Sequence, residues 1–312
     1  MPCFSPIRGW QHWQSNVHGT HPLTFDRRKS NGNRMSVPCG QCIGCRIDRS
    51  REWAIRIKHE ASFHQENSFI TLTYAPEHLP YDGSLRPGDF QRFMKRLRKE
   101  LDPKKIRFFH CGEYGDRLSR PHYHAVIFGH AFDDRHPVGT GPSGTVYSSP
   151  QLARVWGKGF VTVGDVTFES AAYVARYVTK KVNGKQKDQH YEVVNTQTGE
   201  IHPVHPEYAT MSRRPGIAKE WFEQYASDVY PHDFVVHKGR KVRTPRYYDR
   251  LLAQADPDLF GEVKRSRPEK AKRHKEDLTD ERLAERKEVF ERKIQTLKRA
   301  YDHGDTENFQ RL

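Results

Sequence analysis

The amino-acid sequence predicts an α+β protein in which an antiparallel sheet carries helices on one face. The expected elements follow one another as strand, helix, strand, strand, helix, strand and helix. Only a short turn separates the two central strands, so they are expected to pair antiparallel, with the helices packed against their sheet. With 312 residues, the chain is long enough to bury a full core as one large domain or two smaller ones.

The first expected elements are a helix and a buried strand. Residues 1–45 are rich in proline, glycine and basic residues and are expected to be irregular, whereas residues 46–65 carry the apolar stripe of a helix. The run 69–74 predicts a buried strand, because it is rich in β-branched and aromatic residues. A second helix is expected to open at Pro87, with Asp89 as its N-cap.

The centre of the sheet is expected in two apolar segments, residues 106–112 and 122–128, joined by a turn rich in Gly, Asp and Ser. The following elements are a Gly/Pro/Ser-rich loop at 139–149, a short helix at 152–156, a strand at 160–166 and a helix that begins near residue 169.

The C-terminal part of the chain has a different character. Residues 183–200 are polar and are expected to form either a hairpin or a mobile loop. Residues 216–230 predict a helix, and residues 234–243 predict a basic hairpin that turns at Lys238-Gly239-Arg240-Lys241. Residues 262–293 are densely charged with a narrow apolar stripe, which predicts one long solvent-exposed helix and leaves a coiled-coil partner open.

The charge balance favours a polyanionic partner. The net charge is +14, and phosphate neutralisation by Lys and Arg supplies most non-specific affinity for nucleic acid. An anionic membrane surface is the competing interpretation, but no uninterrupted apolar stretch reaches the length of a transmembrane span. The first residues lack the apolar core of a signal peptide, so we expect a soluble, intracellular protein.

The cysteines predict a structural zinc site. Three of the five cysteines are spaced as a Cys-x-x-Cys-x-x-Cys cluster, namely Cys39, Cys42 and Cys45. In an intracellular protein this spacing indicates metal binding before a disulfide, and zinc requires a fourth ligand. Cys3 is the expected fourth ligand, with His12 or His18 as alternatives. The competing interpretation is a set of reduced, partly buried thiols.

A second metal site is expected on the central strands. His122 and His124 are two residues apart, so on a strand their side chains point to the same side. The turn between the strands would place Glu113 opposite this pair. Two imidazoles and one carboxylate leave open positions for a substrate oxygen on a catalytic Mg²⁺ or Mn²⁺. A lone His-x-His on a strand, by contrast, is usually structural.

Two tyrosines follow on the last helix of the sheet region. Tyr173 and Tyr177 are four residues apart and therefore share one helical face. Taken alone, such a pair is more often packed aromatic residues than a pair of nucleophiles. The interpretation as a catalytic site rests on the joint order of the apolar strand, the glutamate, the paired histidines and the paired tyrosines.

That joint order resembles the HUH endonucleases, the initiators of rolling-circle replication. Residues 69–74 are similar to the first motif of the family, residues 120–128 to its second motif and residues 173–181 to its third. Residues 1–235 also resemble the replication initiation proteins of the Microviridae, small single-stranded-DNA bacteriophages, and particularly their gokushovirus branch. The segments that carry this second resemblance are Cys39-Gly40-Gln41-Cys42-Ile43-Gly44-Cys45, Ser50-Arg51-Glu52-Trp53-Ala54 and Gly112-Glu113-Tyr114-Gly115.

The resemblance implies a ferredoxin-like antiparallel sheet with flanking helices, to which the Cys-rich N-terminal segment and the charged C-terminal helix are added. It implies nicking of single-stranded DNA at the viral origin by the two tyrosines, which join the enzyme to a 5′ phosphate and release a 3′ hydroxyl. The basic residues expected to bind nearby phosphates are Arg120, Arg176, Lys180 and Lys181. Plain surface charge at a helix C-terminus is the alternative for the last three.

The sequence contains no Gly-x-x-x-x-Gly-Lys-Ser/Thr loop for ATP. Helicase activity is therefore expected from another protein, and a host helicase and a host DNA polymerase are the expected partners in the cytoplasm of the infected bacterium. Two rival functions remain open: a non-enzymatic, zinc-stabilised DNA-binding protein, and a metal-dependent phosphoesterase that uses water.

The sequence divides into four expected domains. They are the Cys-rich segment and helix at 1–65, the endonuclease core at 66–182, an accessory helix and hairpin at 183–255, and the charged tail at 256–312.

Overall fold

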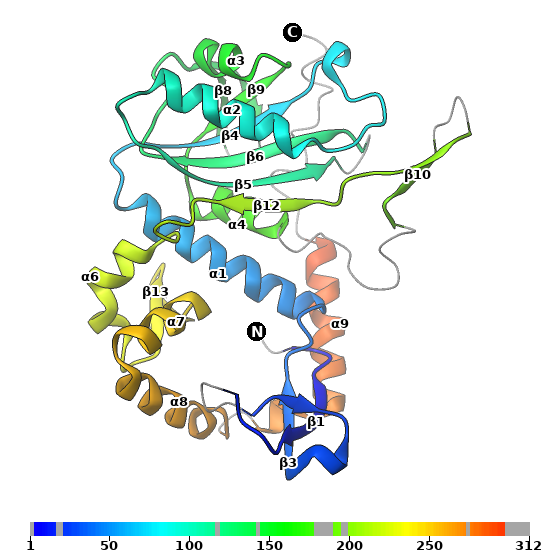
Figure 1. The fold of residues 1–312 in the computed structure, drawn as a ribbon, viewed down its shortest axis with the longest axis vertical. Coiled ribbons are helices and arrows are strands. Elements are labelled where there is room, and N and C mark those ends of the chain that lie inside the picture. Colours follow the sequence, from blue (N-terminus) through cyan, green and yellow to red (C-terminus); the bar gives the residue numbers. More distant parts are fainter. Residues whose placement is uncertain are drawn as a thin grey trace. The chain divides into compact units, whose positions relative to one another are not determined.

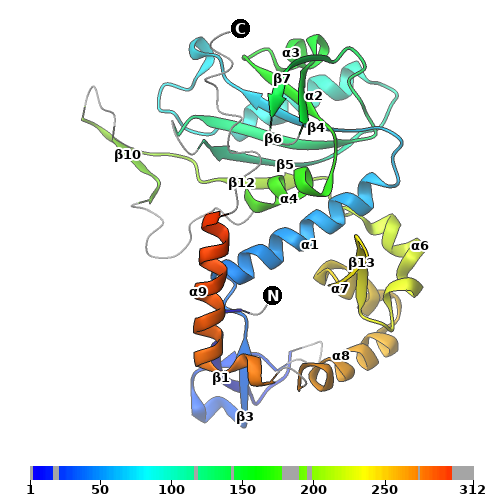
Figure 2. The same ribbon diagram turned by 180° about the vertical axis from the view of Figure 1, so that it is seen from behind.

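The computed structural model of the chain describes residues 3–16, 21–115, 119–141, 144–177, 190–194, 199–272 and 275–296 (Figure 1). The described residues belong to two compact units. One combines residues 1–49 with residues 264–298, and the other comprises residues 50–263. Figure 2 shows the same ribbon from behind. Among the described residues, none of the helices has both the length and the apolar character that crossing a membrane requires.

A seven-stranded antiparallel sheet forms the centre of the larger unit. Its strand order is β12-β5-β6-β4-β9-β8-β7. The bounds are β4 (Asn67–Thr73), β5 (Arg107–Tyr114), β6 (Pro121–Phe128), β7 (His136–Gly141), β8 (Gly144–Ser148), β9 (Val161–Gly164) and β12 (Tyr208–Met211). The expected mixed architecture and its central pair of strands are confirmed.

The loop predicted at residues 139–149 is wrong. These residues form most of the hairpin β7–β8, and Tyr147 of β8 pairs with Val163 of β9. The glycines that suggested a loop lie at Gly139, Gly141 and Gly144, within paired strands or at the hairpin tip. The β-branched residues between them supply the strand, and pairing with β9 extends the sheet.

Helices cover both faces of the sheet, so the expectation of helices on one face is wrong (Figures 1 and 2). On one face, α2 (Pro87–Glu100) and α3 (Pro150–Trp156) pack on alternate strand residues such as Ile70 and Ile127. On the other face, α1 (Ile43–Ala61) and α4 (Phe168–Tyr177) pack on residues such as Phe69 and Val126. Every residue of β6 is buried, because successive side chains enter opposite cores.

The start of α2 differs from the expectation. Arg86 is the N-cap, and Asp89 lies inside the first turn, so the prediction of Asp89 as the cap is wrong. Asp89 is buried and accepts a 2.6 Å hydrogen bond from the hydroxyl of Tyr74, which lies 2.8 Å from the hydroxyl of Tyr123. Burial raises the pKa of Tyr74, so its phenol stays protonated and donates. The carboxylate therefore joins α2 to the strands beneath it.

The remaining elements of the larger unit follow the sheet. Strand β10 (Glu192–Val194) lies within the polar region 183–200 and pairs with β11 (Ile201–Pro203), which follows that region; residues 183–189 and 195–198 are outside the described residues. The helix expected at 216–230 is α6 (Lys219–Val229), and the predicted basic hairpin is β13 (Phe234–His237) with β14 (Arg240–Arg243). The unpredicted helix α7 (Arg246–Ala255) packs its buried Tyr248 and Leu252 in the same core as α1.

The smaller unit contains a three-stranded sheet, so the prediction of an irregular segment over residues 1–45 is wrong. Its order is β2-β1-β3, with β1 (Ile7–His12), β2 (Leu23–Thr24) and β3 (Ser30–Val37). The helix α9 (Asp280–Thr296) packs against this N-terminal segment. Arg8 donates a 2.7 Å hydrogen bond to Asp280, and the rings of Phe4 and Phe290 lie 5.8 Å apart. Long-range partners, rather than local pattern, order these residues.

The single long helix predicted at residues 262–293 is also wrong. The chain forms α8 (Pro257–Lys272), a 3₁₀ turn (Lys275–Leu278) and α9. Thr279 explains why α9 begins at Asp280, because the Thr279 hydroxyl accepts a 3.3 Å hydrogen bond from the backbone N–H of Arg282. A threonine in this position caps a helix, and so it separates two helices within one charged sequence.

Gly159 provides a test of the packing at the end of β4. Its φ is +140°, and an added Cβ would lie 2.1 Å from the backbone nitrogen of Ala75. We expect Gly159→Ala to lower the free energy of unfolding by about 3 kcal/mol, from backbone strain and overlap together. Gly139→Ala is the matched control, because nothing lies within 4 Å of its Cβ position. Urea denaturation measures both, and equal stabilities would contradict the close packing described.

Candidate functional site

The register of β5 and β6 brings the predicted acidic and imidazole side chains together. Glu113 on β5 lies directly opposite His122 on β6, and Cys111 lies opposite His124. Directly opposed residues of an antiparallel pair share a face, so Glu113 and both histidines point to the same side of the sheet. The two imidazole planes are 7° from parallel, with ring centroids 6.4 Å apart. All three side chains are buried.

The imidazole of His124 is held at both nitrogens. Its Nε2 lies 2.8 Å from Oε1 of Glu113, and its Nδ1 lies 2.9 Å from the hydroxyl of Thr71. Thr71 is on β4, in register with His124, so it reaches the ring from the other neighbouring strand. Sequence reasoning missed Thr71. The sequence did contain a pattern that could have indicated Thr71, because side chains alternate within the strand predicted at 69–74 and Thr71 therefore shares one face with Phe69.

The imidazole of His122 has a defined orientation. Its Nδ1 lies 2.6 Å from the carbonyl oxygen of Arg120, which can only accept, so Nδ1 carries the proton. The guanidinium of Arg120 donates a 2.8 Å hydrogen bond to the carbonyl of Tyr74. Both contacts fix the chain at the start of β6, and with Nδ1 protonated, Nε2 is the nitrogen of His122 that could coordinate a metal ion.

Tyr173 lies against His124 on the face covered by α4. Its ring is perpendicular to the ring of His124, with centroids 5.1 Å apart, and it also meets Phe69 edge to face. The side chain is 7% exposed. The guanidinium of Arg176, one turn later and on the exposed side, lies 5.4 Å from the Tyr173 ring centroid. The structure therefore places the Tyr173 phenol against the imidazole of His124, which contacts the carboxylate of Glu113, while His122 lies beside His124 with ring centroids 6.4 Å apart.

Local sequence explains how α4 begins. The backbone N–H of Thr167 donates to the hydroxyl of Ser170 at 2.9 Å, and the N–H of Ser170 donates to the hydroxyl of Thr167 at 3.1 Å. This reciprocal pair satisfies two donors at the helix start, in the manner of a capping box. Tyr177 is the last residue of α4, and its side chain lies outside the described residues, as do Lys180 and Lys181.

Glu113, His122 and His124 are of the ligand types that a divalent cation accepts, whereas among the described residues only the cysteine cluster already brings its ligand atoms within 4.8 Å of one another. Imidazole nitrogen and carboxylate oxygen are ligands that such ions accept, and three protein ligands leave positions for a substrate. When Nδ1 of His124 donates its proton to Thr71, the lone pair of Nε2 faces the carboxylate of Glu113 at 2.8 Å. When Nδ1 instead accepts from the Thr71 hydroxyl, Nε2 donates a hydrogen bond to Glu113, and a bound metal ion would replace that proton.

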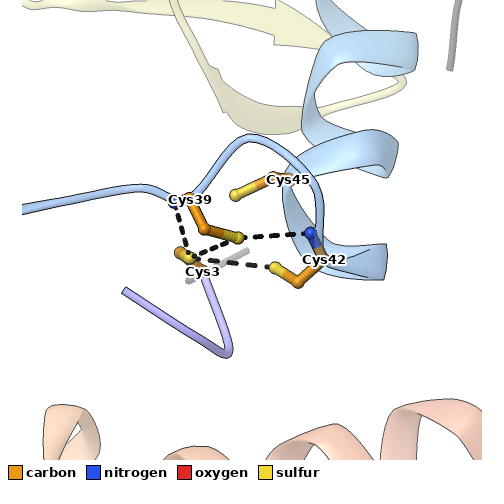
Figure 3. A group of neighbouring side chains, drawn as sticks. All are labelled: Cys3, Cys39, Cys42 and Cys45. Atoms are coloured by element: carbon orange, nitrogen blue, oxygen red, sulfur yellow. Dashed lines mark hydrogen bonds between the residues drawn. The ribbon is translucent and has the colours of Figure 1, made fainter. Parts of the chain in front are cut away.

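Four cysteines form a second candidate metal site, in the smaller unit (Figure 3). The sulfur atoms of Cys3, Cys39, Cys42 and Cys45 all lie within 4.8 Å of one another. The sulfur of Cys3 is 3.5 Å from that of Cys39 and 3.8 Å from that of Cys42. All the cysteines are free thiols. Four sulfur ligands at this spacing form a closed set that can hold a structural metal ion such as zinc.

Backbone amides donate to sulfur atoms of this cysteine cluster, and the thiols differ in pKa, since burial raises the pKa of Cys3 and of Cys45. The N–H of Cys39 donates to the sulfur of Cys3 at 3.2 Å, and the N–H of Phe4 donates to the sulfur of Cys42 at 3.4 Å. Burial raises the pKa of the Cys42 thiol, but hydrogen bonds from the Cys45 and Phe4 amides and from neighbouring thiols outweigh it, and the pKa falls to about 6. A thiol deprotonated near neutral pH is the form that binds metal.

The alternative fourth ligands are not in this group. The Nδ1 of His12 accepts a 3.1 Å hydrogen bond from the backbone N–H of Gln14, and His12 belongs to strand β1. His18 lies outside the described residues. The structure thus unites the three clustered cysteines with Cys3, which is far away in sequence.

Comparison with known proteins identifies the family. The chain is 34% identical over 275 residues to the replication-associated protein VP4 of Bdellovibrio phage phiMH2K. The aligned region covers 84% of this chain and 80% of that protein. The chain belongs to the phage replication-associated proteins. It is also 34% identical over 264 residues to the replication-associated protein ORF2 of Spiroplasma virus 4, covering 80% of this chain and 78% of the relative. No solved structure matches it.

The family model for the replication-associated protein ORF2/G2P matches residues 67–182. The match begins at the first residue of β4 and continues beyond the end of α4. It therefore contains Glu113, both histidines of β6 and Tyr173, whereas the cysteine cluster lies before it. These findings confirm the resemblance to phage replication initiation proteins that the sequence motifs indicated.

Zinc analysis tests the cysteine cluster. We expect about one zinc ion per chain, because one closed set of four sulfur ligands is formed. Cys42→Ser should reduce the zinc content and the thermal stability of the smaller unit, since metal binding is coupled to folding. Cys111→Ser should retain the zinc, because Cys111 lies on β5 outside the cluster. Elemental analysis of native protein without any zinc would contradict the site.

Proposed function

We propose that the protein initiates rolling-circle replication as an HUH-type endonuclease that nicks single-stranded DNA by tyrosine transesterification. The carrying observation is the position of Tyr173, whose ring lies 5.1 Å from His124 and perpendicular to it, while His124 contacts Glu113. This position supports the proposal that Tyr173 is the nucleophile and that it reacts beside the proposed metal ligands Glu113, His122 and His124. The names of the relatives, which are replication-associated proteins of phages, support the same role.

The proposed reaction exchanges one ester for another. The Tyr173 oxygen forms a bond to the scissile phosphorus while the bond from phosphorus to the 3′ oxygen breaks. The phenol loses its proton to solvent, and the departing 3′ oxygen takes one up. The enzyme is then joined to the 5′ phosphate and a 3′ hydroxyl is released. Because one phosphate ester replaces another, the reverse reaction can close a circle without an external energy source.

The phenol needs activation, because a free tyrosine has a pKa near 10 and only about 0.1% is ionised at pH 7. In this proposal the guanidinium of Arg176, which lies 5.4 Å from the centroid of the Tyr173 ring, binds a phosphate next to the scissile one. When bound by Glu113, His122 and His124, Mg²⁺ or Mn²⁺ supplies positive charge that polarises the phosphate. Contacts of Thr71 and of the Arg120 carbonyl with Nδ1 of the two imidazoles support this assignment, because they leave Nε2 of each ring as the candidate ligand.

Tyr177 is proposed as the second nucleophile of a repeated cycle. It lies four residues after Tyr173, so it follows one helical turn later on the same face of α4. One tyrosine would hold a DNA end while the other cuts the regenerated origin. Arg120, Lys180 and Lys181 are proposed as further DNA contacts. A host helicase and a host polymerase would unwind and copy the DNA in the cytoplasm of the infected cell.

A covalent adduct tests the nucleophiles. We expect purified protein to form a denaturation-resistant adduct with single-stranded viral origin DNA in Mg²⁺ or Mn²⁺. Tyr173→Phe and Tyr177→Phe should each retain some first nicking but lose repeated circle release, whereas the double variant should form no adduct. Peptide mapping of the adduct decides the site, and a linkage at another residue would refute this assignment. DNA binding without cleavage would favour the non-enzymatic rival, and cleavage without an adduct would favour a water-dependent phosphoesterase.

The metal ligands and their support are tested separately. His122→Ala and His124→Ala should abolish nicking with little loss of fold, because the ligand set is incomplete. Thr71→Val preserves shape but removes the hydrogen bond to Nδ1 of His124, and it should reduce activity about 10- to 100-fold. Thr71→Ser keeps the hydroxyl and is the control. Nicking by the double His variant at the rate of native protein would rule out these ligands.

A further inference from the structure

We propose that the outward face of the β13–β14 hairpin is a second contact for single-stranded DNA, next to the start of the helix that bears Tyr173. This inference rests on the proposed function, since it extends the DNA path beyond the reacting phosphate. The hairpin belongs to the larger unit but lies outside residues 67–182, the part matched by the family model.

The register separates the hairpin into two faces. Val235 is buried and pairs with Val242, so this cross-strand pair points into the core. The neighbouring pairs therefore point outward, because successive residues of a strand alternate sides. The outward residues are Phe234 with Arg243 and Val236 with Lys241. Val236 is 63% exposed, and both basic side chains are exposed.

The chemistry of the outward face matches single-stranded nucleic acid. The Nζ of Lys241 lies 4.5 Å from the centroid of the Phe234 ring. Single-stranded DNA binds where bases stack on aromatic rings while Lys and Arg neutralise the phosphates. Phe234 is half-buried, so part of its side chain is exposed, and the ring of His232 also lies near it, with centroids 5.9 Å apart. Two basic residues flank it and an exposed valine extends the apolar surface.

The inward face attaches the hairpin to the tyrosine helix. The ring of His237 stacks on the ring of Phe168, the first residue of α4, with centroids 4.0 Å apart. The Nζ of Lys238 lies 2.7 Å from Oε1 of Glu169. This ion pair offsets the acidic charge in the first turn of α4, which would otherwise repel phosphate. Phe168 precedes Tyr173 by five residues, about 7.5 Å along the helix axis.

The turn keeps the two strands in a fixed arrangement. Lys238 and Gly239 are its central residues, with φ values of 48° and 73°. Positive φ at both positions is the feature of a two-residue type I′ turn, which suits the twist of a hairpin. A preformed surface loses less entropy when it binds a strand than a mobile loop would.

Salt-dependent binding tests the proposed surface. The double variant Lys241→Ala/Arg243→Ala is compared with Lys95→Ala/Lys99→Ala, which removes the same charge from exposed positions on α2. The probe is fluorescein-labelled oligothymidylate, followed by anisotropy without added divalent cation. Each lost phosphate contact lowers the salt slope of log K by about 0.7, so the hairpin variant should lose about 1.4 and the control nothing. An unchanged slope, or an equal loss in the control, would overturn the proposal.

Two further variants define the mechanism of binding. Lys241→Arg/Arg243→Lys keeps both charges and should retain the native slope. Phe234→Leu should weaken binding about tenfold with an unchanged slope, because stacking is lost while phosphate contacts remain. No cleavage occurs in this assay, so absence of a covalent adduct would refute the proposed nicking without affecting this test. Native binding by both the double Ala variant and Phe234→Leu would refute the hairpin contact alone.

Discussion

The hydrogen-bond register between β5 and β6 is the constraint on which the candidate site depends. It places Glu113 opposite His122 and leaves His124 two residues further along the same face. A slip of one residue would turn either strand over, moving its ligands into the opposite core. The site is therefore as stable as the central sheet itself. Burial of every β6 residue in one of two cores specifies the register strongly.

The two faces of the sheet have different tasks. The face covered by α2 and α3 is filled by apolar residues and the Tyr74–Asp89–Tyr123 hydrogen-bond network, and it supports the strands from behind. The face covered by α1 and α4 carries the histidines, and the packing of α4 places Tyr173 against His124. Strand β6 contributes to both faces because its side chains alternate: Tyr123 points to one core and both histidines point to the other.

The start of α4 combines several kinds of local support. Thr167 and Ser170 cap the helix, Lys58 of α1 donates to the carbonyl of Val166 at 3.2 Å, and the hairpin contributes the His237–Phe168 stack. The nucleophile proposed here thus sits on a helix whose entry is held from two other elements. A phenol must align with phosphorus to react, and small displacements reduce rates strongly, so such support favours catalysis.

The sequence by itself determined the residues of the proposed chemistry, because strand alternation and helical spacing are local properties: they indicated Glu113, the histidine pair and the tyrosine pair. It also indicated the central strands and the basic hairpin. Only the tertiary structure decided which helices cover which face and that Thr71 contacts His124, and it selected Cys3, the expected fourth ligand of the cysteine cluster, over His12. It also ordered the N-terminal sheet and divided the charged C-terminal region. These depend on partners distant in sequence, whose packing energy overrides local propensity and leaves no periodic signal in the segment itself.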